Sequence, residues 1–251
     1  MPVPFWPALI AGIFAVAALY SSVGHGGASG YLAVLVLAGF ARPDVTPVVL
    51  ILNILVAGIG FITYRRAGHF SSRLLFPFLV TSMPGAFIGG MIILADRTYE
   101  LIVGYALVAA ACRFVIFTRV SVSASEASPR LLWTVGPPIG LALGLLAGMV
   151  GVGGGIFLSP LLLIMGWADA KRTGAVSSAF ILANSLTGLV AQLARGAVVD
   201  GGLLAPLLVT ALIGGVLGSS LGASRLSLPT LQRLLGVVLA IAGLKLLAHL
   251  W

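Results

Sequence analysis

The sequence predicts an all-α, polytopic helical membrane protein built from two inverted repeats. Of its 251 residues, 60% are hydrophobic and only 8% are charged, whereas a soluble domain carries about 25% charged residues. Several apolar runs approach about 20 residues, the length at which a helix crosses the hydrocarbon core. A glycine-rich stretch occurs twice, and the two copies lie 127 positions apart. Together these features exclude an ordinary soluble domain and indicate an internal duplication.

The apolar segments occur in the same order in each half of the chain. In the first half they lie at about 5–21, 29–40, 45–64, 74–94 and 101–117, with a break expected at Pro84-Gly85. In the second half they lie at about 131–149, 156–167, 173–194, 203–222 and 228–250. The second segment of each half has only about a dozen residues, so we expect short or re-entrant helices there. The expected repeats are 1–120 and 131–251, joined by a polar linker at 121–130.

Basic residues predict the orientation in the membrane. Arg65, Arg66 and Arg73 form the densest basic cluster, so we place their loop in the cytoplasm. The first two segments of each half begin and end on the same face, whether both cross or they form a re-entrant hairpin. Each half therefore makes an odd net number of crossings. The second half starts on the opposite side, and both termini lie outside. The net charge of +8 serves topology and contact with anionic lipid rather than nucleic acid.

The two glycine loops, Val23–Ala28 and Val150–Gly155, are the first candidate binding residues. Irregular backbone at membrane depth is tolerated only where protein buries it or where it lines a cavity. Successive N–H groups, followed by a helix N-terminus, suit a small anion. The alternative is close helix packing, which we favour for Gly58, Gly60, Gly140, Gly144 and Gly148. The candidate site glycines are Gly24, Gly26, Gly27, Gly151, Gly153, Gly154 and Gly155.

Polar side chains inside the apolar segments complete the candidate site. His25 is a candidate proton relay, although the second copy of the loop has Val152 at that position. Asn53 and Asn184 lie near the middle of the third segment of each half. Their amides either contact the substrate or join helices. Ser177 and Ser178 supply further donors, which in membrane helices often bond their own backbone.

We expect no cofactor and no metal. The glycine loops lack the Lys-Ser/Thr of a phosphate-binding loop, and no strand precedes them. The six acidic residues fall in loops or at segment ends, and the single cysteine rules out a cysteine-based metal cluster. The expected partners are a small anionic substrate and the lipid bilayer, with no nucleic acid; the oligomeric state stays open.

The stretch Gly151–Leu161, with its downstream Pro160, resembles the signature of the sulfite exporter TauE/SafE family, and the resemblance covers essentially the whole chain. The first copy departs from it at His25 and at Ala33, where the second copy has Pro160. The resemblance implies a permease of the bacterial or archaeal inner membrane that exports small sulfur-containing anions, such as sulfite or organosulfonates, by alternating access.

Three alternatives stay open at this point. Gly27-Ala28-Ser29-Gly30 fits the G-x-S-G pattern of an intramembrane serine protease, which would need a histidine within reach of Ser29. A passive anion channel would use the same glycine loops without alternating access. A purely structural membrane subunit would have no need of two unwound segments.

Overall fold

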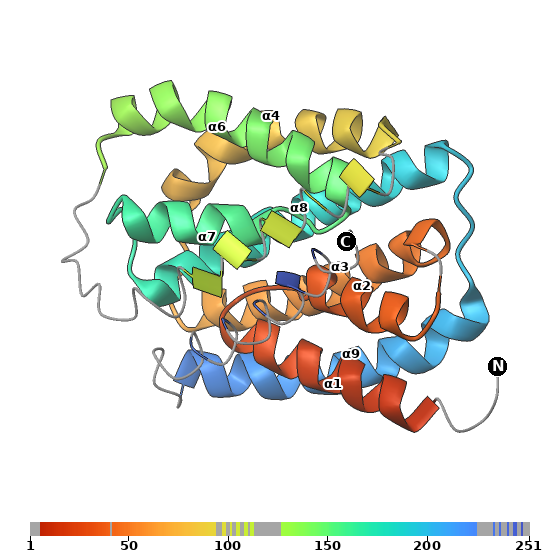
Figure 1. The fold of residues 1–251 in the computed structure, drawn as a ribbon. Coiled ribbons are helices and arrows are strands. Elements are labelled where there is room, and N and C mark those ends of the chain that lie inside the picture. Colours follow the sequence, from red (N-terminus) through yellow and green to blue (C-terminus); the bar gives the residue numbers. More distant parts are fainter. Residues whose placement is uncertain are drawn as a thin grey trace.

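The computed structural model describes residues 6–40, 42–93 and 127–224, with scattered positions between 97 and 112 and between 233 and 247. All regular structure among these residues is helical, as the sequence predicts (Figure 1). The fifth segment of each half (101–117 and 228–250) and most of the linker fall outside the continuously described residues. The described helices are α1 (Trp6–Ser22), α2 (Ala28–Leu37), α3 (Arg42–Arg66), α4 (Ser72–Met91), α6 (Pro129–Val150), α7 (Gly155–Ile164), α8 (Ala170–Ala194) and α9 (Gly201–Ser224).

Within the described part of the chain, five helices are long and apolar enough to cross a membrane, namely α3, α4, α6, α8 and α9. By contrast, α2 and α7 have 10 residues each. At about 1.5 Å per residue, such a helix covers about half of the hydrocarbon core. The chain is therefore a polytopic helical membrane protein with two short helices at the predicted places.

The glycine loops interrupt the helices where the sequence predicts. One loop separates α1 from α2 at residues 23–27, and the other separates α6 from α7 at residues 151–154. The break expected at Pro84-Gly85 is wrong, because α4 is helical throughout with Pro84 inside it. Packed membrane helices tolerate proline in this way. Gly85 instead lets α6 approach closely, since a Cβ there would lie 2.8 Å from the carbonyl oxygen of Leu141.

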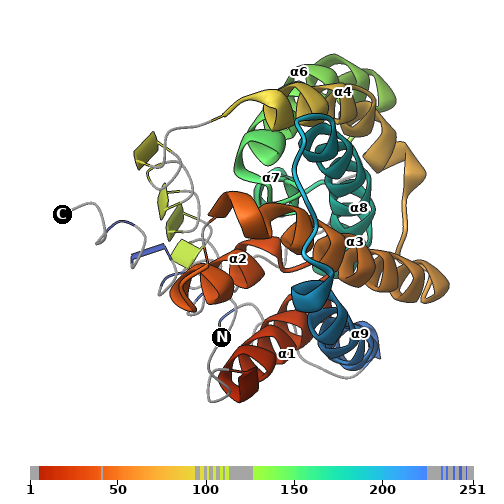
Figure 2. The same cartoon turned by 90° about the vertical axis from the view of Figure 1, so that its right-hand side faces the viewer.

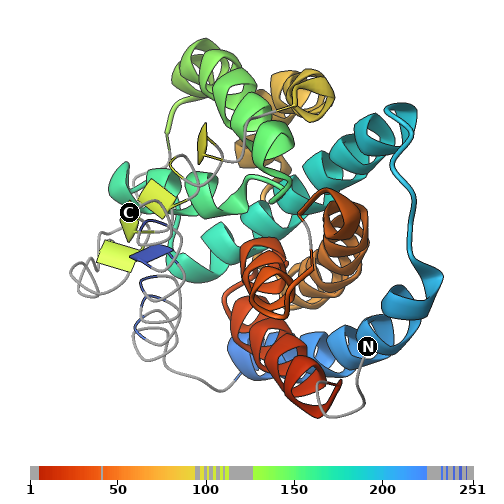
Figure 3. The same ribbon diagram turned by 45° about the vertical axis from the view of Figure 1, so that its right-hand side comes forward.

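The helices form three layers, which can be followed in Figures 1, 2 and 3. One outer layer pairs α4 with α6, the other pairs α1 with α9, and α3 packs against α8 between them. In the predicted repeats α1 corresponds to α6, and α4 corresponds to α9. The two outer layers are therefore the same contact made twice, with the repeats exchanged.

The central helices α3 and α8 run antiparallel. Residue numbers rise along α3 as they fall along α8 in the contacts Leu50–Gly188, Gly60–Ser178 and Tyr64–Gly174. Each of these helices is the third of its half, so equivalent helices point in opposite directions. This is the geometry expected of inverted repeats. The repeat boundaries at 1–120 and 131–251 stay a prediction.

Glycines hold the outer layers together. A Cβ at Gly140, Gly144 or Gly148 on α6 would collide with backbone carbonyls of α4. Gly218 and Gly222 on α9 meet the backbone of α1 in the same way. Such small-residue contacts are typical of membrane helices.

The packing expected at Gly58 and Gly60 on α3 is wrong. A Cβ at Gly58 would lie 3.9 Å from its nearest neighbour, and one at Gly60 would lie 3.7 Å away. Both distances are ordinary van der Waals contacts, so neither position requires glycine for space.

Candidate functional site

The two glycine loops have the same backbone construction. Gly27 caps the N-terminus of α2 with a φ of 100°, and Gly154 caps α7 with a φ of 75°. Both values lie in the left-handed region, which L side chains rarely adopt. The backbone N–H of His25 donates to Tyr20 O, and that of Val152 donates to Ala147 O, a pair of bonds 127 positions apart. The repeat seen in the sequence is therefore also a repeat in the backbone.

Each loop packs against the third helix of the other half. A Cβ at Gly24 would collide with the backbone of Gly174 on α8. A Cβ at Gly151 would lie 2.9 Å from Thr46 on α3. The loops therefore meet the central pair of helices from both sides.

Asn53 connects the two halves. Its Oδ1 accepts a hydrogen bond of 3.0 Å from the backbone N–H of Ala28, at the start of α2. Its Nδ2 donates at 2.7 Å to the hydroxyl of Ser185 on α8. Because the N–H of Ala28 can only donate, the oxygen of the amide must face α2. Asn53 is fully buried, so both ends of its amide are satisfied within the protein.

Glycines make room for this amide. A Cβ at Gly26 would collide with Asn53 Oδ1, and a Cβ at Gly153 would lie 2.6 Å from Asn53 Nδ2 and 2.5 Å from Ser185 Oγ. One residue of each loop thus lies against Asn53. The structure brings Gly26, Asn53 and Gly153 together.

The side chain of His25, in the first glycine loop, contacts the second half of the protein. Its Nδ1 lies 3.2 Å from Val23 O, and its Nε2 lies 3.0 Å from Ser159 Oγ. Ser159 in turn donates to Ser177 Oγ at 2.7 Å. His25 is only 3% exposed. The imidazole and two hydroxyls form a continuous buried chain between the halves.

Two of the predicted side chains bond within their own helix. Ser178 Oγ donates to Ala175 O at 2.9 Å, and Asn184 Nδ2 donates to Phe180 O at 3.0 Å. Asn184 Oδ1 is buried and has no hydrogen-bond partner among the described residues. Asn184 is therefore not the counterpart of Asn53 in the hydrogen-bonding network.

The space around the first loop is small. A cavity of about 10 Å³ remains beside Asn53, which is enough for about one water molecule. Polar groups of the first half face apolar side chains of the second across it. Its lining residues are Tyr20, His25, Gly26, Gly27, Ala28, Ser29, Asn53, Val152, Ile156 and Ile181.

Sequence reasoning missed Ser159 and Ser185 as members of this cluster. Ser159 stands inside the glycine-loop signature, immediately before Pro160, and this position could have indicated that it lies near the loop. Ser185 directly follows Asn184, and only the antiparallel crossing of α3 and α8 reveals that it faces Asn53.

The serine of the G-x-S-G match is not paired with His25. Ser29 Oγ lies 3.0 Å from Tyr20 OH, and the hydroxyl that contacts His25 belongs to Ser159. A protease centred on Ser29 lacks the histidine contact that its chemistry needs.

Comparison with known proteins identifies the family. Residues 8–246 match the sulfite exporter TauE/SafE family. The chain is 32% identical over 240 residues to a protein of Sinorhizobium fredii named "Probable membrane transporter protein y4hK", and the match covers 93% of this chain and 95% of that protein. No solved structure matches the chain. The repeated glycine loops thus lie at the centre of a multi-pass membrane protein of a transporter family, and the chain belongs to the sulfite exporter TauE/SafE family.

Proposed function

We propose that this protein is a permease that moves small sulfur-containing anions, sulfite or organosulfonates, across the inner membrane by alternating access around the two glycine loops. Export is the proposed direction, the proposed partners are the anion and the lipid bilayer, and no catalytic step is part of the proposal. The family match supports the transporter class. The substrate, the direction and the mechanism rest on the argument that follows.

The hydrogen bond from Ala28 N to Asn53 Oδ1 carries the proposal. A helix N-terminus presents donors and a partial positive charge, which favour an oxygen that carries negative charge. Here a neutral amide oxygen takes that position. An oxyanion would compete for the same N–H group with a full charge, and such charge-assisted bonds are roughly twice as strong as neutral ones.

Substrate entry then requires Asn53 to move. The cavity beside it has room for about one water molecule, which is too small for an anion with several heavy atoms. Because Asn53 also bonds Ser185 on α8, displacing its amide would loosen the contact between the two halves. Binding and rearrangement are thereby coupled, as alternating access requires. A permanently open anion channel would not close around its site in this way.

A flux screen tests the proposal. Purified protein in liposomes is supplied with sulfite, thiosulfate, sulfoacetate, taurine or sulfate, and uptake or release of each is compared with protein-free vesicles. We expect saturable flux of sulfite or of a sulfonate. Vesicles that contain folded protein and carry none of these solutes would refute the substrate class.

A further inference from the structure

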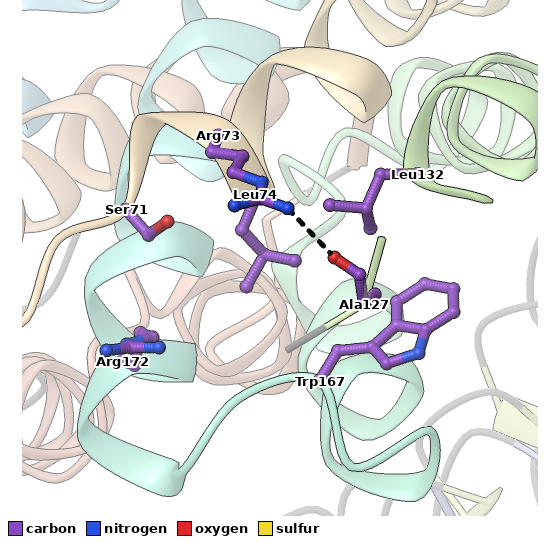
Figure 4. Close-up of a pocket in the computed structure, with 7 residues that line it drawn as sticks. All are labelled: Ser71, Arg73, Leu74, Ala127, Leu132, Trp167 and Arg172. Atoms are coloured by element: carbon purple, nitrogen blue, oxygen red, sulfur yellow. Dashed lines mark hydrogen bonds between the residues drawn. The ribbon is translucent and has the colours of Figure 1, made fainter. Parts of the chain in front are cut away.

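A pocket at the end of the molecule that carries the basic cluster contains two arginines from different helices. It has a volume of about 100 Å³ and lies between the start of α4 and the start of α8. Figure 4 shows Arg73 and Arg172 on either side of Ser71, with the Trp167 ring on the far wall. The basic residues predict that this end faces the cytoplasm.

The charge in this pocket is positive. Arg73 is exposed and lines the pocket, and its Nη2 donates to Ala127 O over a long distance of 3.5 Å. Arg172 is half-buried on the first turn of α8, where it makes further contacts of its own. The nearby acid Asp169 caps α8 by accepting from the backbone N–H of Arg172 at 2.8 Å. Among the described residues, the lining of this pocket therefore contains two arginines and no acidic side chain.

The pocket has a counterpart at the opposite end of the molecule. Phe40 and Val45 line a cavity of about 730 Å³ there, and each lies 127 positions before a residue of the first pocket, Trp167 and Arg172. The two pockets thus occupy equivalent places in the repeats. We call the pocket with Arg73 and Arg172 the basic mouth, and the equivalent cavity the acidic mouth.

The acidic mouth carries the opposite charge. Asp44 and Asp200 line it together with one arginine, Arg195. Asp200 stands at the position equivalent to Ser71, and its Oδ1 caps α9 by accepting from Gly202 N at 2.9 Å. Arg195 Nη1 donates to Gly90 O at 2.9 Å. The two mouths therefore occupy equivalent places in the repeats and differ in the charge of their side chains.

The basic mouth lies next to the central loops. Arg172 is followed on α8 by Thr173, whose Oγ1 is buried and has no hydrogen-bond partner in the described part of the chain. The next residue, Gly174, packs against Gly24 of the first glycine loop. Arg172 and Gly174 are two positions apart, so the basic mouth and the first glycine loop contact the same turn of α8 from different faces.

We infer that the basic mouth is an oxyanion-binding site, formed by Arg73, Arg172 and Ser71, which collects the substrate before it reaches the glycine loops. This inference rests on the proposed function. Guanidinium groups match the oxygens of sulfite and sulfonates with two donors each, and a positive cleft raises the local anion concentration. The acidic mouth disfavours the return of a released anion. The charge difference speeds capture on one side; it does not itself drive accumulation.

The fluorescence of Trp167 provides a local test. In full-length protein with Trp6, Trp133 and Trp251 replaced by Phe, sulfite and methanesulfonate are titrated in detergent at constant ionic strength with chloride. We expect a saturable change in Trp167 emission. Arg73→Gln and Arg172→Gln should each weaken the apparent affinity about tenfold. The matched control Arg66→Gln, an exposed arginine on the same basic end, should leave the affinity unchanged.

Flux measurements separate this inference from the proposed function. The double variant Arg73→Gln/Arg172→Gln should raise KM for sulfite by about tenfold or more and leave the maximal rate near that of the wild type. If the wild type transports sulfite and both variants keep its KM and its titration curve, the collecting site is wrong and the permease stands. If the wild type transports no anion, the proposed function fails whatever Trp167 reports.

A lipid phosphate is the competing occupant. The titration is repeated with phosphatidylglycerol added to the micelles. Binding of that lipid at Trp167, with no response to sulfite or methanesulfonate, would overturn the collecting site. A sulfite response that persists in purely zwitterionic detergent supports it.

Discussion

Asn53 on α3 donates a hydrogen bond of 2.7 Å to the hydroxyl of Ser185 on α8, across the antiparallel contact of these two helices. The other end of the same amide accepts from the N–H of Ala28 at 3.0 Å. One side chain thus ties the N-terminus of a short helix to the opposite half of the protein. An anion that takes the place of Asn53 Oδ1 would change both contacts.

Replacing Asn53 by Leu should abolish transport and destabilise the protein. The substitution leaves the buried N–H of Ala28 and the hydroxyl of Ser185 without partners, at a cost of about 1–3 kcal/mol for each group. Thermal unfolding in detergent and sulfite flux in liposomes measure the two effects.

Asn184→Leu is the matched control for this change. Asn184 bonds only its own helix and leaves Oδ1 unpaired, so Leu should be neutral or slightly stabilising and should preserve flux. Equal losses in the two variants would contradict the distinction between the two asparagines.

Replacing Gly153 by Ala should block transport by steric conflict. The new Cβ would lie 2.5 Å from Ser185 Oγ and 2.6 Å from Asn53 Nδ2, so the central contact must open. Gly39→Ala shares the positive φ, 89° against 71°, but its Cβ would meet no atom of the described residues within 4 Å. Both variants therefore carry backbone strain of about 1–2 kcal/mol, and only Gly153→Ala should lose sulfite flux. Loss of flux in both would mean that strain, rather than the contact with Asn53, is responsible.

Replacing His25 by Gln should remove the response of transport to a pH gradient, if the buried chain to Ser159 and Ser177 conducts protons. Ser159→Ala interrupts the same chain one step later and should have the same effect. His69→Gln, which alters a half-buried histidine outside this chain, serves as the control. Sulfite flux is measured with and without an imposed pH gradient. Unchanged coupling in His25→Gln would exclude the relay.

Replacing Gly144 by Ala should destabilise the outer layer formed by α4 and α6. Its Cβ would collide with the backbone of Ser82, and neither helix backbone can yield locally. Gly58→Ala, whose nearest contact would be 3.9 Å away, should unfold at the wild-type temperature or above it. Thermal unfolding of both variants in detergent tests this comparison, and similar melting of the two would contradict it.

The sequence predicts much of this architecture because its signals are local or repeated. The lengths of the apolar runs predict the helices, and the glycine loops that contain Gly24 and Gly151 predict where the helices are interrupted. Basic residues predict opposite orientations, which agrees with the antiparallel contact of α3 and α8. The contacts within the candidate site are harder to predict from the sequence. They depend on the register between distant helices, and this register pairs Asn53 with Ser185 rather than giving Asn184 an equivalent role.

Proline and histidine illustrate the same limit. Pro84 predicts a helix break from local geometry, yet the helix continues because packing against α6 compensates. His25 is visible in the sequence as a buried ionisable residue, but its partner Ser159 lies 134 positions away and follows from no local pattern.

Solute counterflow tests the central claim most directly. Liposomes that contain the protein are loaded with unlabelled sulfite at high concentration and diluted into a trace of radiolabelled sulfite. An alternating-access permease exchanges one for the other, so we predict a transient accumulation of label above its external concentration, which Gly39→Ala retains and Gly153→Ala loses. Label that only equilibrates, without an overshoot, would contradict alternating access around the glycine loops.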